Sequence, residues 1–204
     1  MATILIVSKT KMQKGLCCGG IDTNTCELIR IHNEHGGTLS FDTPFEIGDR
    51  WQMDVETAWN KRSAPHTEDK QTRPIEKIDN IGMQGIVNFI NAHDFGPKLT
   101  RGSIASTFEG CLKLHGSKNF IDREHIPSFS TQFWIADTDL QHISQWDKHY
   151  YTYNNIRLKY VGFQNPIDCI PTGTIIRLSL AHWWNGDGSG VDKCYLQLSG
   201  WYIP

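Results

Sequence analysis

The stretch from residue 3 to residue 31, TILIVSKTKMQKGLCCGGIDTNTCELIRI, decides the fold. Its two ends, Thr3–Ser8 and Cys26–Ile31, are runs of β-branched or alternating residues, which is the pattern of β-strands. Between them lie three glycines and the polar sequence Asp22–Thr25, which indicate turns. The segment therefore predicts two neighbouring strands at the start of a β-rich protein.

Further strands are predicted along the rest of the chain. Trp51–Trp59 alternates and makes a third strand in the first half. In Thr174–Ala181 apolar residues recur at every second position on one side, which predicts a half-buried strand, and Asn185–Gly190 makes the turn after it. The strands predicted in the second half are Thr131–Ala136, Ile156–Phe163, Thr174–Ala181 and Lys193–Ile203.

The middle of the chain predicts a loop, a helix and a linker. The polar segment Pro65–Pro74 cannot bury a face and is expected to be a loop. Apolar residues then recur at intervals of three and four between Ile75 and Ile90, which indicates one amphipathic helix or two short ones, although Gly82 and Gly85 weaken the pattern. Gly96–Gly102 resembles a linker.

These elements predict a mainly β protein with minor α content. The 204 residues exceed a usual domain of about 100 to 150, and no period of 20 to 50 residues repeats. We expect two small antiparallel barrels, or one split barrel, joined through a helix. The predicted domains are residues 1–97, a first barrel with the connecting helix, and residues 98–204, a second barrel.

Composition restricts the classes of function. A hydrophobic content of 39% excludes a disordered chain. With 20 basic and 22 acidic residues, the net charge of −2 excludes binding of nucleic acid by bulk attraction, so any polyanion site must be a local patch. The apolar runs are too short to cross a bilayer and no secretion signal is evident. We expect a cytoplasmic protein with no membrane partner and six reduced cysteines.

Several short motifs follow one another along the chain. They are Ser8-Lys9, Gly15–Ile21, Leu28–Ile31, Pro65–Asp69, Ile176–Leu180 and Cys194–Leu198. Their order resembles the prokaryotic dual OB-fold domain family, which has two oligonucleotide/oligosaccharide-binding barrels in one unit. The resemblance implies two OB-like barrels packed as one unit with a connecting helix. It also implies a nucleic-acid or nucleotide-binding module of bacterial systems, defence against viruses among them, and brings no reaction with it.

The resemblance implies that Lys9, Lys11, Arg30, His66 and Glu68 lie near one end of the first barrel. The three cations could meet phosphate oxygens, with His66 and Glu68 orienting them or binding a base edge. In the structural alternative the lysines are solvated, Arg30 pairs with Glu68, and His66 hydrogen-bonds a loop. Both interpretations stay open.

Aromatic residues suggest a second binding surface. The run Tyr150–Tyr153 is followed by Arg157 and Lys159, and aromatic rings beside cations are typical of surfaces that hold single-stranded nucleic acid. Tyr151 and Tyr153 are the candidates for stacking on bases. The alternative is that both rings belong to the core.

Metal, cofactor and enzyme motifs are weak. Cys17, Cys18, Cys26, His32 and His35 lie close in sequence but lack a C-x₂₋₄-C pair, and Cys111 with His115 is equally incomplete, so no metal or cofactor is predicted. The H-x-E of residues 66–68 has no downstream P-C-x-x-C, which excludes a zinc deaminase. Phosphate-loop, dinucleotide-binding and nucleophile-elbow motifs are also absent from the sequence.

Three hypotheses follow in order of preference. The first is a non-catalytic module that binds nucleic acid or a nucleotide. The second is an adaptor that joins protein partners in a larger assembly. The third is an enzyme acting on a nucleotide or modified base, with His66 and Glu68 as acid and base. A thiol enzyme using Cys17 or Cys18 with His66 is the least favoured.

Overall fold

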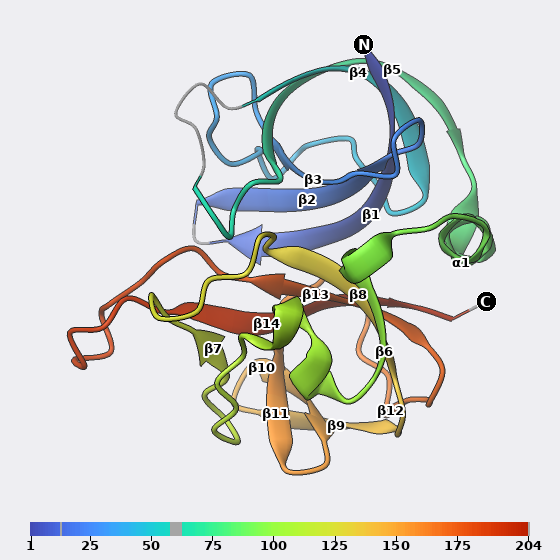
Figure 1. Ribbon diagram of the computed structural model, residues 1–204. Helices are drawn as coiled ribbons and strands as arrows, with labels where there is room; N and C mark the ends of the chain where they lie inside the picture. Colours follow the sequence, from blue (N-terminus) through green and yellow to red (C-terminus); the bar gives the residue numbers. More distant parts are fainter. Residues whose placement is uncertain (13, 58–62, 204) are drawn as a thin grey trace. The chain divides into compact units, whose positions relative to one another are not determined.

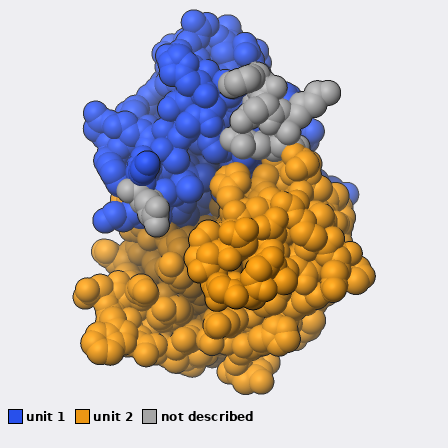
Figure 2. Space-filling model, turned by 90° about the vertical axis from the view of Figure 1, so that its left-hand side faces the viewer, with its two compact units in different colours: residues 1–62, 68–96, 202–204 blue, residues 63–67, 97–201 orange. Residues whose placement is uncertain are grey.

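The computed structural model describes residues 1–12, 14–57 and 63–203 (Figure 1). These residues form a mainly β protein with one α-helix and three short 3₁₀-helices. None of the helices in the described ranges has the length and apolarity to span a bilayer. The chain divides into two compact units, coloured in Figure 2, which we call unit 1 (residues 1–62, 68–96 and 202–204) and unit 2 (residues 63–67 and 97–201).

Unit 1 contains a closed five-stranded barrel. Its strands are β1 (Ala2–Met12), β2 (Gly15–Asp22), β3 (Leu28–His32), β4 (Asp49–Thr57) and β5 (Asp69–Asn80), and the helix α1 (Gly82–Ala92) follows them. The barrel order is β1-β2-β3-β5-β4, with β3 and β5 parallel and the other neighbours antiparallel. This Greek-key order with five strands defines an OB-type barrel.

Alternation along the strands fills this barrel. Ile4 and Ile6 of β1, and Ile29 and Ile31 of β3, face the interior, so that every second residue is in the core. The remaining core side chains are Leu16, Cys18, Leu39, Phe45 and Met53. Trp51 packs its ring edge-on against Phe45, with ring centroids 5.2 Å apart. Residues between these positions point out of the barrel.

Unit 2 is built on a large sheet in the order β12-β9-β10-β11-β14-β13-β8-β6, with β7 paired to β14. The middle strands surround a core rich in aromatic residues, including Trp134, Tyr151 and Trp201. The strands are β6 (Leu99–Gly102), β7 (Phe120–Ile121), β8 (Thr131–Ala136), β9 (Leu140–Gln145), β10 (Lys148–Tyr153), β11 (Ile156–Tyr160), β12 (Cys169–Ile170), β13 (Ile175–Leu180) and β14 (Cys194–Tyr202). The 3₁₀-helices are Gly96–Lys98, Ile104–Ser106 and Phe108–Gly110.

The strand order of unit 2 repeats that of unit 1 when β8 and β9 are taken as one broken strand. Only residues 137–139 separate them, β8 pairs with β13, and β9 pairs with β10. The order from β8/β9 through β10, β11, β14 and β13 back to β8 then matches β1-β2-β3-β5-β4. The parallel pair β11–β14 corresponds to β3–β5. The expected mainly β fold with two OB-like units is confirmed.

The glycine part of the first predicted turn region is wrong, because residues 15–22 form β2 between the two predicted strands, whereas the polar turn is confirmed at residues 23–25. Gly20 explains the glycine content. A Cβ atom at this position would lie 2.5 Å from the Cγ2 atom of Ile4, closer than packed carbon atoms can approach. Glycine therefore serves here to let two strands of a narrow barrel pack closely, and not to make a turn.

The predicted loop Pro65–Pro74 is confirmed at residues 65–68 and wrong at residues 69–74, and the predicted start of the helix is also wrong. Residues 69–80 form β5, which pairs with β4 along almost its whole length, and α1 begins only at Gly82. Ile75 and Ile78 lie in the strand and are 48% and 47% exposed, so their spacing did not mark a buried helical face. The Asn80 side chain accepts a hydrogen bond from the Gly82 backbone and helps to begin the helix there.

In the second half the strand at residues 131–136 is confirmed, and the other three differ from the predicted ends by one to three residues. The predicted linker contains β6, which pairs in parallel with β8. The residues of β13 are buried on both sides of the strand, whereas the sequence predicted burial on one side only. On the side that was expected to be exposed, Arg177 donates a hydrogen bond to Ser199 inside the protein. Trp59 of the third predicted strand lies outside the described residues. The boundary at residues 97 and 98 stays a prediction.

Replacing Gly20 with Ala tests the close approach in the first barrel. The added methyl group should lower the free energy of unfolding by about 1–3 kcal/mol, because the core must shift to admit it. In an Ile4→Ala background the same change should cost much less, and chemical denaturation of the four proteins of this cycle measures the difference. Equal costs in both backgrounds would contradict the proposed contact.

Candidate nucleic-acid interface

The strands β10, β11 and β14 of unit 2 present one side to the core and the other away from it. Tyr151, Leu158 and Leu196 belong to the core cluster, and alternation turns their neighbours outward. We call these outward residues the outer face of unit 2. They are Lys148, Tyr150, Thr152, Arg157, Lys159, Tyr195 and Gln197.

Cations and an aromatic ring are adjacent on this outer face. The strand register places Tyr150 opposite Lys159 and Thr152 opposite Arg157. The Arg157 guanidinium lies 4.5 Å from the centre of the Tyr150 ring and donates a hydrogen bond to Gln145 at 2.9 Å. This contact is a cation–π interaction, and it holds the ring and the charge side by side. Lys148 and Lys159 are exposed, and in the described part of the chain neither forms an ion pair.

Trp146 stands in the turn between β9 and β10, two residues before Lys148. Its side chain is 87% exposed and its backbone has a positive φ of 50°. A large ring this exposed contributes nothing to the core of unit 2. It is therefore available to pack against a ligand. The corresponding turn of an OB fold, between the first and second strands, commonly contacts ligands.

A second aromatic group lies where β7 pairs with β14. The Tyr195 ring lies 5.9 Å from both Phe120 and Trp184, measured between centroids, and Trp184 is 51% exposed. The Lys193 ammonium lies 4.9 Å from the centre of the Phe120 ring. These residues extend the aromatic content of the outer face toward the β13–β14 hairpin.

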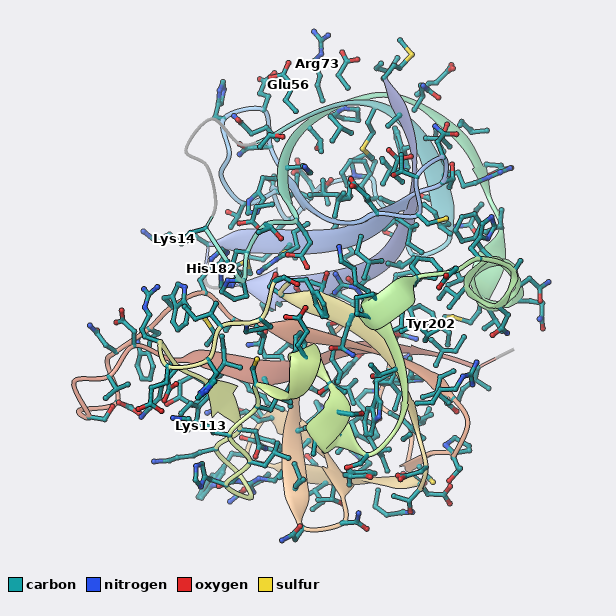
Figure 3. All side chains as sticks on the ribbon, viewed as in Figure 1. Lys14, Glu56, Arg73, Lys113, His182 and Tyr202 are labelled. Atoms are coloured by element: carbon teal, nitrogen blue, oxygen red, sulfur yellow. The ribbon has the colours of Figure 1, made fainter. Side chains whose placement is uncertain are left out.

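The lysines beside the second group are neutralised. Lys193 pairs with Asp187 at 2.6 Å, and this hydrogen bond, with others from Ser189 and Tyr195, holds the pKa of Asp187 well below its usual range. Lys113, labelled in Figure 3, is bound by Asp122 and Glu124. The uncompensated positive charge of the outer face therefore comes from the strands β10 and β11.

The structure places the predicted lysines of the first barrel in different environments. Lys9 is only 8% exposed, and its ammonium donates hydrogen bonds of 2.9 Å to the Phe45 carbonyl and to Glu46. Lys11, two residues further along β1, is exposed. Lys9 thus has a structural role in fixing the loop before β4, whereas Lys11 is accessible to solvent.

Arg30 is buried in unit 1 and faces Asp69 across the parallel pair of β3 and β5. Its Nε atom lies 3.5 Å from one Asp69 oxygen, and His32 Nε2 lies 3.4 Å from the other. Burial lowers the pKa of Arg30, but the neighbouring Cys17, Asp69 and Glu68 together raise it above the usual value. Arg30 is therefore a fixed charge inside a polar cluster.

His66 and Glu68 belong to different units and both are buried. In unit 2, His66 Nε2 lies 3.2 Å from the Ala181 carbonyl, and its ring stacks at 4.3 Å on that of His182, labelled in Figure 3. In unit 1, the Glu68 carbonyl accepts a hydrogen bond from the Arg30 backbone. Of the five residues predicted around the first barrel, four lie in unit 1 and His66 does not.

Tyr151 and Tyr153 cannot stack on bases, because their rings lie in the core of unit 2 with 0% and 4% exposure. Their hydroxyl groups donate to the Ile167 carbonyl and to Asp137, and burial raises the pKa of both phenols. Arg157 and Lys159 do lie on the outer face. The aromatic residue beside them is Tyr150, which strand alternation alone could have selected over Tyr151.

The cysteines and histidines of residues 17–35 do not form one ligand set. Cys18 faces the barrel core, so its neighbour Cys17 points to the opposite side of β2. Cys26 lies in the turn before β3 with a positive φ of 59°. His32 is engaged by Asp69, and His35 is exposed. These five side chains therefore do not converge on one point.

The two OB-like units define the class of the protein as a β protein with paired OB folds. The family model of the dual OB-containing domain matches residues 2–201, and the chain belongs to this family. Neither the comparison with curated proteins nor that with solved structures yields a match.

Substitution of Lys9 separates a structural from a binding role. Lys9→Met should lower the free energy of unfolding by about 1.5–3 kcal/mol, because two hydrogen bonds from a charged donor are lost. Lys11→Met should change it by less than about 0.5 kcal/mol. Urea denaturation of both variants measures the effect. Unchanged stability of Lys9→Met would show that the Phe45 and Glu46 contacts are not maintained in solution.

Proposed function

We propose that unit 2 binds single-stranded nucleic acid across its outer face. The observation that carries the proposal is the Tyr150 ring held 4.5 Å from Arg157, with exposed Lys148 and Lys159 on the same side of the sheet. This is the combination of a stacking platform with cations that single strands require. The exposed Trp146 ring adds a second platform at the edge of the face.

Strand order supports the location. In OB folds, oligonucleotides bind on the face of the second and third strands and to the loops beside it. β10 and β11 occupy these two places in unit 2, and the turn holding Trp146 precedes β10. The residues of the outer face therefore stand where an OB fold positions a ligand.

The charge distribution is consistent with weak, localised attraction of a polyanion. The whole chain carries a net charge of −2, so long-range attraction to phosphates is small. A local positive patch is supplied by Lys148, Arg157 and Lys159. Stacking of bases on the aromatic rings beside this patch must contribute much of the affinity for nucleic acid. Rings stack only on unpaired bases, so we expect a preference for single strands over duplexes.

A binding module is favoured over an enzyme. His66 is 3% exposed, and its Nε2 atom already contacts a backbone carbonyl. An acid–base role would require both His66 and Glu68 to become accessible to substrate. Only the sequence resemblance and the composition support a place in a bacterial defence system, an adaptor role and a cytoplasmic location.

Aromatic substitutions test the stacking platforms. Tyr150→Ala and Trp146→Ala should each weaken binding of a fluorescein-labelled single-stranded RNA or DNA by roughly 5- to 100-fold, since each stacked base contributes about 1–3 kcal/mol. Fluorescence anisotropy at low salt measures the affinity. Phe41→Ala is the matched control, because Phe41 is an exposed aromatic residue of unit 1. An equal loss in the control, or no binding by the unmodified protein, would refute the proposal.

Salt dependence tests the cations separately. Lys159→Ala should reduce the slope of log affinity against log salt by about 0.7, the value for one phosphate contact on a single strand. Arg73→Ala is the control, because Arg73 is an exposed cation of unit 1 (Figure 3). An unchanged slope in Lys159→Ala would show that this lysine does not contact a phosphate of the bound strand.

A further inference from the structure

Two histidines face each other on the side of β9 and β10 opposite to the outer face. His142 Nε2 lies 3.0 Å from His149 Nδ1, and the ring planes differ by 22° with centroids 5.2 Å apart. His142 also contacts the ring of the buried Tyr151 at 5.3 Å. Neither histidine is fully buried, so the pair is accessible from solvent.

The separation of the two nitrogen atoms suits chelation. Imidazole binds zinc at about 2.0–2.1 Å, so two imidazole ligands at bond angles of about 90–110° have nitrogen atoms about 2.8–3.4 Å apart. The nitrogen atoms of His142 and His149 already lie within this range. A metal ion could therefore replace the hydrogen bond between the rings with little movement of either side chain.

The sheet sets a carboxylate, that of Asp168, on the same side as this pair, and its side chain must rotate before an oxygen lies within 4.8 Å of both facing nitrogens. β12 pairs with β9 so that Cys169 lies opposite Gln141, and the His142 backbone donates to the Asp168 carbonyl at 2.9 Å. The same register sets Asp168 opposite His142, and opposite residues on antiparallel strands have their side chains on one side of the sheet. Asp168 is exposed, so its carboxylate is able to turn toward the histidines.

Neighbouring groups narrow the ligand set. Cys169 lies on the other side of the sheet, where its sulfur accepts a hydrogen bond from Gln141 at 3.5 Å. The Tyr151 hydroxyl is engaged with the Ile167 backbone.

We propose that His142, His149 and Asp168 bind a divalent transition-metal ion of the zinc type, with water completing the coordination. Two imidazoles and one carboxylate form a typical three-ligand set of such ions, whereas magnesium and calcium prefer oxygen ligands. In the neutral pair one ring donates its N–H to the other. On metal binding that proton moves through solvent to the far nitrogen of the same ring, so both facing nitrogens present lone pairs and no net proton is released.

This site is independent of nucleic-acid binding, because its side chains leave the sheet on the side opposite to the outer face. The three ligands come from β9, β10 and the start of β12, which are adjacent in the sheet. A bound ion would connect these strands and stabilise unit 2, since a ligand that binds only the folded state raises its stability.

The test is titration of the EDTA-treated, full-length protein with Zn²⁺ at pH 7.5 by isothermal calorimetry. We expect one tight equivalent, whose affinity falls at least about tenfold in His142→Gln and in His149→Gln, and less in Asp168→Asn. His35→Gln is the matched control, since His35 is an exposed histidine of unit 1. Its affinity should equal that of the unmodified protein. The circular dichroism spectrum of each metal-free variant verifies that it is folded.

A spectroscopic readout examines the geometry directly. Long-range ¹H–¹⁵N spectra should show that Zn²⁺ shifts Nε2 of His142 and Nδ1 of His149, and leaves their far nitrogens protonated. Bound Co²⁺ should give the visible absorption bands of a four-coordinate ion. Addition of Mg²⁺ should leave these bands unchanged, because Mg²⁺ should not displace Co²⁺ from nitrogen ligands. No binding at 100 μM Zn²⁺, equal affinity in all four variants, or shifts confined to other histidines would each overturn the proposal.

Discussion

The parallel pairing of the third and fifth strands of each OB-like unit is the constraint on which the rest of the structure depends. In unit 1, β3 and β5 meet with Arg30 opposite Asp69, and an ion pair of these two side chains spans the seam that closes the barrel. In unit 2, β11 and β14 meet with Lys159 opposite Gln197. Without this pair, neither the barrel closure of unit 1 nor the continuous outer face of unit 2 would exist.

Alternation along β10 gives this single strand two different surfaces. Tyr151 and Tyr153 fill the core, whereas Tyr150 and Thr152, which alternate with them along the strand, face outward beside Arg157. Residues adjacent in sequence thus belong separately to the core and to the proposed binding surface. This division is the reason that a cluster of tyrosines in sequence does not make a cluster of accessible rings.

Much of the fold could be predicted from the sequence, because most of its strands have clear alternation. Thr131–Ala136 is correct to the residue. β2 could not be predicted, since its glycines fit a strand only through the contact of Gly20 with Ile4, which is distant in sequence. β5 could not be predicted for a related reason. Its isoleucines are exposed, and they recur at a three-residue spacing that is typical of a helix. Tertiary contacts override local patterns at both places.

Less of the candidate site than of the fold could be predicted from the sequence. Arg157 and Lys159 were already candidates, because cations that follow an aromatic run are visible in sequence, and their binding role stays a prediction. Trp146 was missed, although a tryptophan between polar residues in a turn is a recognisable signal. The burial of Lys9 depends on the Phe45 carbonyl 36 residues away, which no local pattern reveals.

The second half of β5 has a consequence for how the protein behaves at high concentration. Exposed isoleucines in a long strand would ordinarily invite another chain to add alongside and start an aggregate. Pro74 has no amide hydrogen to offer to such a strand, and the register of β5 against β4 shifts twice nearby, which twists the ribbon. The strand can therefore expose apolar side chains to water and still resist polymerisation.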